Sequence, residues 1–223
     1  MIDVVAIDGP AGAGKSSVSR AVAERLGYRY IDSGAMYRVI GFLARERGIA
    51  ADDAAALAAL CGATAISFET RGGQVRVLAD QRDVSRDIRS ADAGQWASKV
   101  SAVPAVRECL VAQQREMAQG GRVVMEGRDI GTVVCPDAAV KIYLDASPRE
   151  RAARRAQELK LRGEVIDLDR MTREIEERDA RDSSRAHSPM KPAEDAVEVD
   201  TTGVPLDDVI NRICELVRTR DRP

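Results

Sequence analysis

Apolar and polar residues follow two different periods along the chain, and the clearest signal comes first. The run Val4-Val5-Ala6-Ile7-Asp8 is short, apolar and bounded by a glycine-rich stretch, which predicts a buried strand. After that stretch, Val18, Ala21, Val22 and Leu26 recur at the spacing of one helical face. The chain is therefore expected to begin as a strand, a loop and an amphipathic helix.

The same alternation of strand and helix continues downstream. Further strands are expected at 28–32, 122–126, 139–144 and 196–200, and helices at 33–47, 52–61, 88–101, 105–119, 147–162, 167–182 and 205–218. Mostly apolar strands suit a parallel sheet that helices cover on both faces. We predict an α/β fold with a five-stranded, parallel, doubly wound sheet and right-handed crossovers.

One segment, at about 64–88, departs from this alternation. Residues 65–69 and 74–78 have strand character and flank a Gly72-Gly73 turn, which predicts a β-hairpin. Residues 81–84 could add a third short strand. We therefore expect a small antiparallel β insert inside the α/β pattern.

Composition narrows the class of protein. Apolar residues make up 44% of the chain and charged residues 31%, as in soluble globular proteins. A net charge of −2 gives no general attraction to nucleic acid or to acidic membranes. No apolar run approaches the roughly 20 residues that span a bilayer, and residues 1–7 do not read as a signal peptide, so a cytoplasmic location is expected.

Cysteine and histidine usage excludes two kinds of chemistry. Cys61, Cys109, Cys135 and Cys214 are scattered and include no C-x-x-C pair, so we expect reduced structural thiols without a disulfide or zinc site. His187 is the only histidine and lies in a loop rich in Ser and Pro. A Ser-His-Asp hydrolase is therefore not expected.

The glycine-rich stretch fits the phosphate-binding pattern G-x-x-x-x-G-K-[ST] from Gly9 to Ser16. Its three glycines can adopt backbone angles that point successive N–H groups inward, at the N-terminus of the following helix. Lys15 would reach the β- and γ-phosphates of a nucleotide, and the Ser16 hydroxyl would bind Mg²⁺. This motif, called the P-loop, predicts a bound nucleoside triphosphate.

Other polar segments also follow strands of the predicted sheet. They are 32–38, 126–132 and the residues after Asp145. Because parallel α/β sheets bind ligands at the carboxyl ends of their strands, we expect these segments to meet the P-loop in one crevice.

The segment after the second strand carries Ser33, Tyr37 and Arg38 within about one helical turn. Part of this set could face a ligand. The alternative is a capped helix with a buried tyrosine and a solvated arginine.

The segment Glu126-Gly-Arg-Asp-Ile-Gly-Thr places two acids and a guanidinium directly after a strand. Glu126 would hold a water of the Mg²⁺ shell, and Arg128 offers a planar fork that suits phosphate oxygens. The alternative is a salt-bridged polar turn.

Residues 149–185 contain ten arginines, one lysine and ten acids, so they are too balanced in charge for a nucleic-acid-binding arm. Arg178, Arg181, Asp182 and Arg185 lie on one helix face, where cations repel unless an anion lies among them. Glu174 and Glu177 could pair with the first two. A solvated, ion-paired face is the alternative to a phosphate-binding one.

Together these motifs resemble the bacterial cytidylate kinase family, P-loop enzymes that phosphorylate CMP and dCMP with ATP. The matching stretches are I-D-G-P-A-G-A-G-K-S, D-S-G-A-M-Y-R, the insert at 64–88, E-G-R-D-I-G-T-V-V, V-K-I-Y-L-D-A-S and E-R-D-A-R-D-S-S-R. The first stretch is shared with many NTPases, whereas the others in this order are specific. The resemblance implies one kinase domain over 1–223, with a core at about 1–32, 102–147 and 193–223, a monophosphate-binding subdomain at about 33–101 and a short helical lid at about 148–165.

The resemblance also implies roles for individual residues. ATP would be held by Gly9, Pro10, Ala11, Gly12, Ala13, Gly14, Lys15, Ser16 and Ser17, together with Arg151 and Arg154 of the lid. CMP would contact Ser33, Tyr37, Arg38, Ser98, Arg107, Arg128, Asp129, Arg178, Asp182 and Arg185. The catalytic residues would be Lys15, Arg38, Arg128 and Arg155. Ser16 would bind Mg²⁺ directly, and Glu126, where some members carry Asp, would hold it through water.

The chemistry of cytosine agrees with part of this assignment. Cytosine presents an N4 amine donor beside the N3 and O2 acceptors, which a carboxylate (Asp129) and donors (Ser33, Arg107) complement. Uracil reverses the first two groups, and a buried mismatch of this kind costs several kcal/mol. The sequence therefore favours CMP over UMP.

Other P-loop proteins are the alternatives. An adenylate, shikimate or dephospho-coenzyme A kinase would share the loop and the sheet. A regulatory NTPase would need a guanine-reading N-K-x-D motif or a partner surface, and neither is found. A non-enzymatic Arg-rich module does not suit the balanced charge of 149–185. We expect a cytoplasmic monomer that binds CMP and dCMP, and neither nucleic acid nor membrane.

Overall fold

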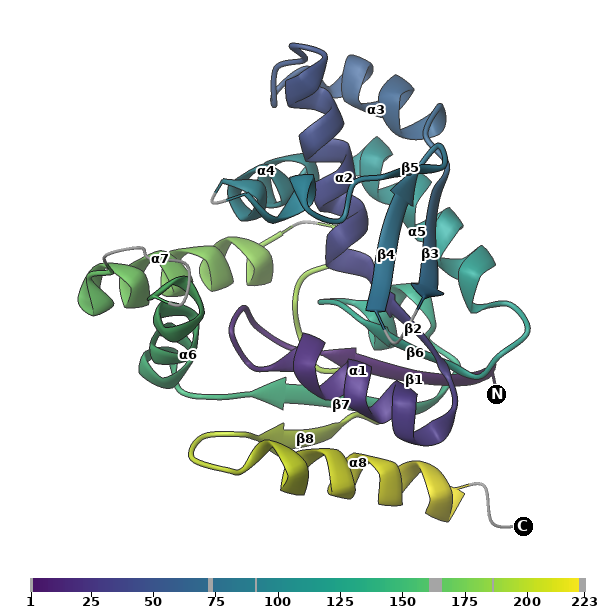
Figure 1. Cartoon of the computed structure of the whole chain (residues 1–223), viewed down its shortest axis with the longest axis vertical. Helices are drawn as coiled ribbons and strands as arrows, with labels where there is room; N and C mark the ends of the chain where they lie inside the picture. Colours follow the sequence, from purple (N-terminus) through teal and green to yellow (C-terminus); the bar gives the residue numbers. More distant parts are fainter. Residues whose placement is uncertain (1, 72–73, 91, 161–165, 186, 221–223) are drawn as a thin grey trace. The chain divides into compact units, whose positions relative to one another are not determined.

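The computed structural model describes residues 2–71, 74–90, 92–160, 166–185 and 187–220, and Figure 1 shows its ribbon. The chain divides into two compact units, Met1–Tyr30 with Gly120–Pro223, and Ile31–Gln119. The boundary falls inside strand β2 (Arg29–Asp32). None of the described helices combines the length and the apolar character that crossing a membrane requires.

The first unit is built on a five-stranded parallel sheet in the order β2-β6-β1-β7-β8. Its other strands are β1 (Ile2–Asp8), β6 (Val123–Glu126), β7 (Ala138–Asp145) and β8 (Val197–Asp200). The central strand β1 pairs in parallel with both neighbours, so that Val5 lies opposite Val124 and Val140. The predicted α/β sheet is confirmed.

The sheet is held together by the apolar run that the sequence pattern marked. Val4 and Ile7 are fully buried in the middle of β1, and their neighbours Val123 and Ile142 are equally inaccessible. Burying an aliphatic side chain of this size contributes about 1.5–3 kcal/mol, so the run anchors the sheet. The loop that follows β1 therefore starts from a rigid point.

Four helices complete the first unit: α1 (Lys15–Leu26), α6 (Pro148–Lys160), α7 (Leu168–Ser183) and α8 (Leu206–Arg220). Helices α1 and α8 contact each other and pack on β6 and β7, and α6 contacts α7. Glycine bounds α1 at both ends, because Gly14 and Gly27 both have left-handed backbones. Asp167 caps α7 by accepting hydrogen bonds from two backbone N–H groups.

The second unit contains α2 (Ser33–Glu46), α3 (Ala54–Gly62), α4 (Ala93–Val100) and α5 (Pro104–Ala118). Its antiparallel sheet consists of β3 (Ile66–Arg71), β4 (Gln74–Ala79) and β5 (Arg82–Asp83). Phe68 lies opposite Val77, as a hairpin requires. The predicted antiparallel insert is confirmed, but its Gly72-Gly73 turn and residues 161–165 of the predicted lid lie outside the described residues.

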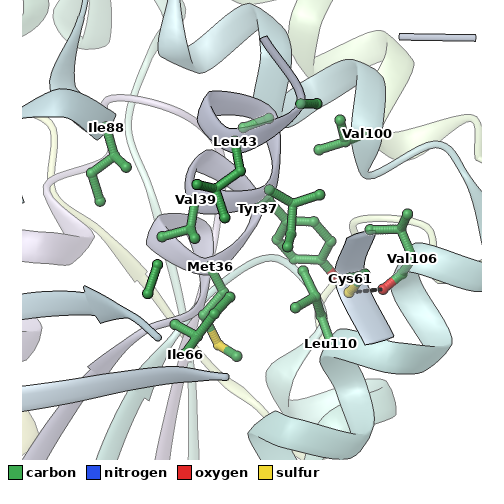
Figure 2. Packing of buried hydrophobic residues seen from close by; sticks show 14 of the residues in the cluster. Met36, Tyr37, Val39, Leu43, Cys61, Ile66, Ile88, Val100, Val106 and Leu110 are labelled. Atoms are coloured by element: carbon green, nitrogen blue, oxygen red, sulfur yellow. Dashed lines mark hydrogen bonds between the residues drawn. The ribbon is translucent and has the colours of Figure 1, made fainter. Parts of the chain in front are cut away.

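The core of the second unit surrounds α2, as Figure 2 shows. Met36, Val39 and Ile40 on α2 are fully buried and belong to a cluster with Leu57 of α3 and Leu110 of α5. Asp32 caps α2 by accepting a hydrogen bond from the Ala35 N–H at 2.8 Å. This helix is therefore fixed along its length, including the first turn that carries the predicted ligand-binding residues.

Two local predictions differ from the structure. The helix predicted over 88–101 is replaced by a 3₁₀ turn at Asp87–Arg89 and by α4, which begins at Ala93. The break occurs because Ser90 is extended (φ −59°, ψ 158°) and its hydroxyl donates to Asp92 Oδ1 at 2.8 Å. Conversely, Ile130–Val134 forms one wide helical turn of π type, where the sequence predicted only a polar segment.

Candidate active site

The P-loop lies between the end of β1 and the start of α1. Gly9, Gly12 and Gly14 have φ of 144°, 79° and 87°, as the motif predicts. The backbone passes close to its neighbours, because a Cβ on Gly9 would lie 1.9 Å from the Leu144 carbonyl oxygen. A Cβ on Gly12 would lie 2.9 Å from Arg151 Cβ. Glycine is therefore required here both for the backbone angles and for the close approach.

Lys15 is the first residue of α1, and 7% of it is exposed. Its ammonium donates a 2.6 Å hydrogen bond to the Pro10 carbonyl oxygen of the same loop. Burial lowers the pKa of Lys15 well below its usual range, and the nearby Arg128 guanidinium lowers it further. An anionic oxygen next to the Lys15 ammonium would raise this pKa again.

Ser16 and Glu126 lie together at the edge of the loop. The Ser16 hydroxyl donates to Glu126 Oε2 at 3.0 Å, and the Tyr30 hydroxyl donates to Glu126 Oε1. Among the described residues no group of three or more His, Cys, Asp or Glu side chains could hold a metal. One hydroxyl and one carboxylate suit Mg²⁺, which usually takes few protein ligands and keeps water or phosphate oxygens at its other positions. The donor set therefore fits the predicted ion.

Asp8 is a site residue that the sequence analysis missed. It ends β1, is 5% exposed, and accepts hydrogen bonds from the backbone N–H groups of Ile130 at 2.9 Å and Gly131 at 2.8 Å. Burial raises the pKa of Asp8 to about 6. The contact fixes the segment that directly follows Asp129. An acid at the end of a fully buried apolar run was the available signal.

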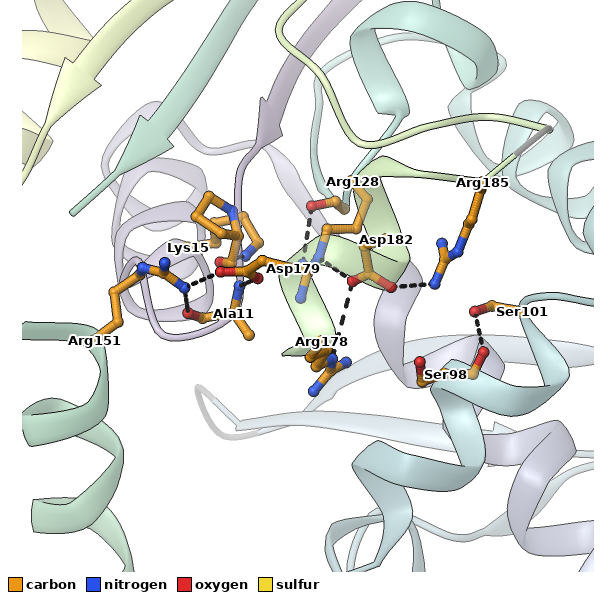
Figure 3. Close-up of polar contacts among 12 residues, drawn as sticks. Ala11, Lys15, Ser98, Ser101, Arg128, Arg151, Arg178, Asp179, Asp182 and Arg185 are labelled. Carbon is orange, nitrogen blue, oxygen red and sulfur yellow. Dashed lines mark hydrogen bonds and ion pairs between the residues drawn. The ribbon is translucent and has the colours of Figure 1, made fainter. Parts of the chain in front are cut away.

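The charged face of α7 carries a buried acid shared by arginines, shown in Figure 3. Asp182 is 2% exposed and accepts hydrogen bonds from Arg185 Nη2 and, at 3.3 Å, from Arg128 Nε. The Nε of Arg178 lies 4.0 Å from the same carboxylate. The structure therefore brings together these four predicted site residues.

The anion among the arginines of α7 is the acid that the sequence places on the same helix face. Glu174, which could pair with Arg178, accepts a 2.8 Å hydrogen bond from Arg170 Nε. Asp182 is the acid that lies between the arginines of α7 and Arg128. Its burial explains why: a charge removed from water needs several close partners.

The three predicted lid arginines have different surroundings. Arg151 is 4% exposed, and its guanidinium donates to the carbonyl oxygens of Ala146 and Ala11, each at 2.9 Å. Arg154 donates to the Thr201 hydroxyl at 2.9 Å and to its carbonyl at 2.7 Å. Arg151 therefore lies at the P-loop, and Arg154 lies at the residue that directly follows β8.

Arg155, in contrast, is a half-exposed side chain whose guanidinium donates to Glu158 of its own helix at 2.9 Å. Its predicted catalytic role remains a prediction. Thr201, the partner of Arg154, was missed because the sequence alone did not indicate that it approaches the loop. Its hydroxyl lies 3.4 Å from the Ala13 carbonyl oxygen.

The second unit positions its own predicted ligands on α2, α4 and α5. Ser33 begins α2 and is 4% exposed, and Arg38 Nη2 donates to Asp32 Oδ2 at 2.6 Å. Asp32 therefore caps the helix and orients Arg38 at once.

Arg107 and Tyr37 form the second grouping in this unit. The Arg107 guanidinium lies over the Tyr37 ring, 5.6 Å from its centroid, and both side chains are buried. Arg107 also donates to the Ser101 carbonyl oxygen at 3.4 Å, and the Ser101 hydroxyl donates to the Ser98 carbonyl oxygen at 2.9 Å. The ends of α4 and α5 are thus tied together next to the predicted base-recognition arginine.

Comparison with known proteins agrees with the pattern of the site. A family model described as "Cytidylate kinase" matches residues 5–219. The chain is 48% identical over 219 residues to "Cytidylate kinase" of Syntrophotalea carbinolica, covering 98% of this chain and 93% of that one. It is 50% identical over 210 residues to "Cytidylate kinase" of Pelotomaculum thermopropionicum, covering 94% and 93%.

A solved structure shares the fold at low sequence identity. An uncharacterized protein from Eubacterium ventriosum is 11% identical, covers 98% of this chain and 99% of its own, and superposes with a TM-score of 0.56. That likeness concerns the fold alone.

Proposed function

We propose, since the chain belongs to the cytidylate kinase family, that it transfers the γ-phosphoryl group of ATP to CMP or dCMP and releases ADP with CDP or dCDP. The observation that supports this most is the P-loop, with Lys15 buried at its end, in a chain that matches the family over residues 5–219. The loop supplies the donor chemistry, and the family match supplies the acceptor.

The donor half consists of residues 9–17 with the arginines of α6. Loop N–H groups would bind phosphate oxygens, Lys15 would reach the β- and γ-phosphates, and Arg151, Arg154 and Arg155 would close over the triphosphate. Ser16 and Glu126 would hold Mg²⁺, which when bound neutralises charge on the phosphate oxygens. Their 3.0 Å contact supports this pairing.

The acceptor half is assigned from the family pattern. Arg38 and Arg128 would bind the phosphate of CMP, and the guanidinium groups would neutralise the transferring phosphoryl group together with Lys15. The residues assigned to cytosine are Ser33, Arg107, Asp129 and Arg185; those assigned to the sugar are Ser98, Arg178 and Asp182, with Tyr37 packed beside them. The acceptor oxygen is anionic at neutral pH, so positioning and charge neutralisation suffice without a general base.

The boundaries of the functional parts are also part of the proposal. Residues 33–101 would bind the monophosphate and lie within the compact unit Ile31–Gln119. Residues 148–165 would form the lid. We further infer a cytoplasmic monomer that binds neither nucleic acid nor membrane. The net charge of −2 supports the last part of this inference, because it gives no general attraction to nucleic acid or acidic membranes.

Discrimination between CMP and UMP tests the acceptor assignment. Asp129 is 5% exposed, and a buried mismatch worth about 3 kcal/mol corresponds to roughly a hundredfold in kcat/KM. We expect kcat/KM for CMP to exceed that for UMP by about that factor, and Asp129→Asn to reduce the ratio. Asp137→Asn, at an exposed acid close in sequence, is the matched control and should leave the ratio unchanged. Equal values for the two monophosphates in the wild type would refute the assignment.

The same assay separates the remaining alternatives. ADP formation is followed with CMP, dCMP, UMP, AMP and shikimate as acceptors, and without an acceptor. Turnover confined to CMP and dCMP is the expected result. Fast ADP formation without any acceptor would instead indicate a regulatory NTPase.

A further inference from the structure

One carboxylate that the proposed reaction does not use lies against the P-loop. Asp179 of α7 accepts a hydrogen bond from the Ala11 N–H at 3.4 Å and another from Arg151 Nη1 at 2.5 Å. Its side chain is 15% exposed. Figure 3 shows Asp179 between Arg151 and the loop. An acid thus lies on a loop whose N–H groups are arranged to bind anions.

The contact occupies groups that a triphosphate needs. Loop N–H groups at the start of a helix bind phosphate oxygens, and Arg151 is one of the arginines assigned to ATP. A carboxylate oxygen and a phosphate oxygen are the same kind of anionic acceptor, so both cannot occupy the same donors at once. The Lys15 ammonium also has a partner within the protein, since it donates a hydrogen bond to the Pro10 carbonyl oxygen.

The distances also indicate which of the two contacts of Asp179 is lost first when a phosphate binds. At 3.4 Å, the hydrogen bond from Ala11 to Asp179 lies beyond the usual range for an N–H donor, whereas the ion pair of Asp179 with Arg151 is short. Arg151 keeps further acceptors in the carbonyl oxygens of Ala146 and Ala11. Releasing Asp179 therefore does not leave the buried guanidinium without partners.

We propose that Asp179 is an internal competitor of ATP, a carboxylate that occupies the Ala11 N–H and Arg151 until phosphate oxygens displace it. This inference rests on the proposed function, because it assumes that the loop binds a triphosphate. Asp179 lies on α7 between Arg178 and Asp182 in the sequence, but it makes its printed contacts with the P-loop and with Arg151. ATP affinity is set partly by this exchange.

The test compares nucleotide binding to the full-length wild type and Asp179→Asn. Dissociation constants for ATP and for inorganic triphosphate are measured by isothermal titration calorimetry without CMP, in 0.15 M and 0.5 M salt. We expect Asp179→Asn to bind both ligands about three- to tenfold more tightly, because the displaced hydrogen bonds are charge-assisted. The gain should persist in 0.5 M salt, since long-range charge effects are screened there.

Two further variants make the result specific. Glu176→Gln removes one charge from an exposed position of the same helix and should leave both dissociation constants unchanged. Asp179→Ala removes both oxygens and should tighten binding in the same direction. Circular dichroism and thermal melting check that each variant is folded, and KM for CMP should stay within about twofold of the wild type.

Opposite results identify other roles. Unchanged or weaker binding in both folded Asp179 variants would overturn the inference, and weaker binding would show that Asp179 supports Arg151 instead of competing with ATP. The proposed function is judged separately, by turnover of CMP in the wild type. Wild-type turnover combined with no gain in affinity would defeat only the inference, whereas tighter binding without CMP turnover would defeat only the proposed function.

Discussion

Gly9→Ala places a methyl group where the P-loop meets the end of β7. The new Cβ would lie 1.9 Å from the Leu144 carbonyl oxygen and 3.0 Å from its carbonyl carbon. Both atoms belong to the backbone of a buried strand, so they cannot turn aside as a flexible side chain would. Asp8, one residue earlier, is in register with Tyr143 of β7. Relief of the clash therefore requires β1 and β7 to separate locally.

The magnitude follows from two contributions. A φ of +144° costs about 1–3 kcal/mol for a residue with a side chain. Forcing an extra methyl group into a packed site costs about 1–3 kcal/mol more. We expect Gly9→Ala to lose about 2–6 kcal/mol of unfolding free energy, and to weaken ATP binding because the loop starts from the displaced residue.

Gly203→Ala is the matched control. Gly203 has a φ of +66°, and nothing described lies within 4 Å of a Cβ added there. Only the left-handed backbone conformation destabilises Gly203→Ala, which should lose about 1–2 kcal/mol of unfolding free energy. Urea denaturation followed by circular dichroism measures both losses, and calorimetry measures ATP affinity. If Gly9→Ala lost no more stability than Gly203→Ala, the steric reasoning would be wrong.

Two further predictions concern ionisable groups at the loop. Lys15→Ala should lower kcat at least about a hundredfold, because the mutation removes a cation that would neutralise the transferring phosphoryl group. Thermal melting should show that the variant is still folded. Near-normal turnover would contradict this role. Asp8 has a folded pKa of about 6 against an ordinary value of 3.8, so its contribution to stability is fully present below 3.8 and is lost as pH rises through 6. When the pH is lowered from 7.5 to 5, the unfolding free energy of the wild type should therefore rise by about 1 kcal/mol relative to that of Asp8→Asn, as measured by urea denaturation. A difference between the two proteins that does not depend on pH would argue against a raised pKa.

The elements that could be predicted from the sequence are those with local causes. β1 is an uninterrupted apolar run, α1 is bounded by Gly14 and Gly27, and Asp32 and Asp167 supply side-chain caps. Each of these signals acts within a few residues and is visible in one dimension.

The elements that were mispredicted depend on contacts made elsewhere. The wide turn at Ile130–Val134 follows the two hydrogen bonds that Asp8 accepts from residues more than a hundred positions away. The break before α4 depends on the backbone of Ser90, whose hydroxyl is engaged by Asp92. Periodicity of apolar residues does not report either contact.

The site residues divide in the same way. The positions of Lys15 and Ser16 at the start of α1 could be predicted because the motif fixes their spacing after the glycine loop. Asp179 could not, because it reaches Ala11 across 168 positions in the sequence and looks like one of many acids on a charged helix. Tyr30 was likewise read only as part of a strand, although its hydroxyl binds Glu126.

The shared acid on α7 has a consequence for the entropy of binding. A long arginine side chain loses about 2 kcal/mol of rotamer freedom when it is fixed in one geometry. Arg128 and Arg185 are already restrained by Asp182 in the folded chain, so that loss belongs to folding and not to the capture of a ligand. If CMP binds at these arginines as proposed, it meets guanidinium groups whose disorder has already been removed.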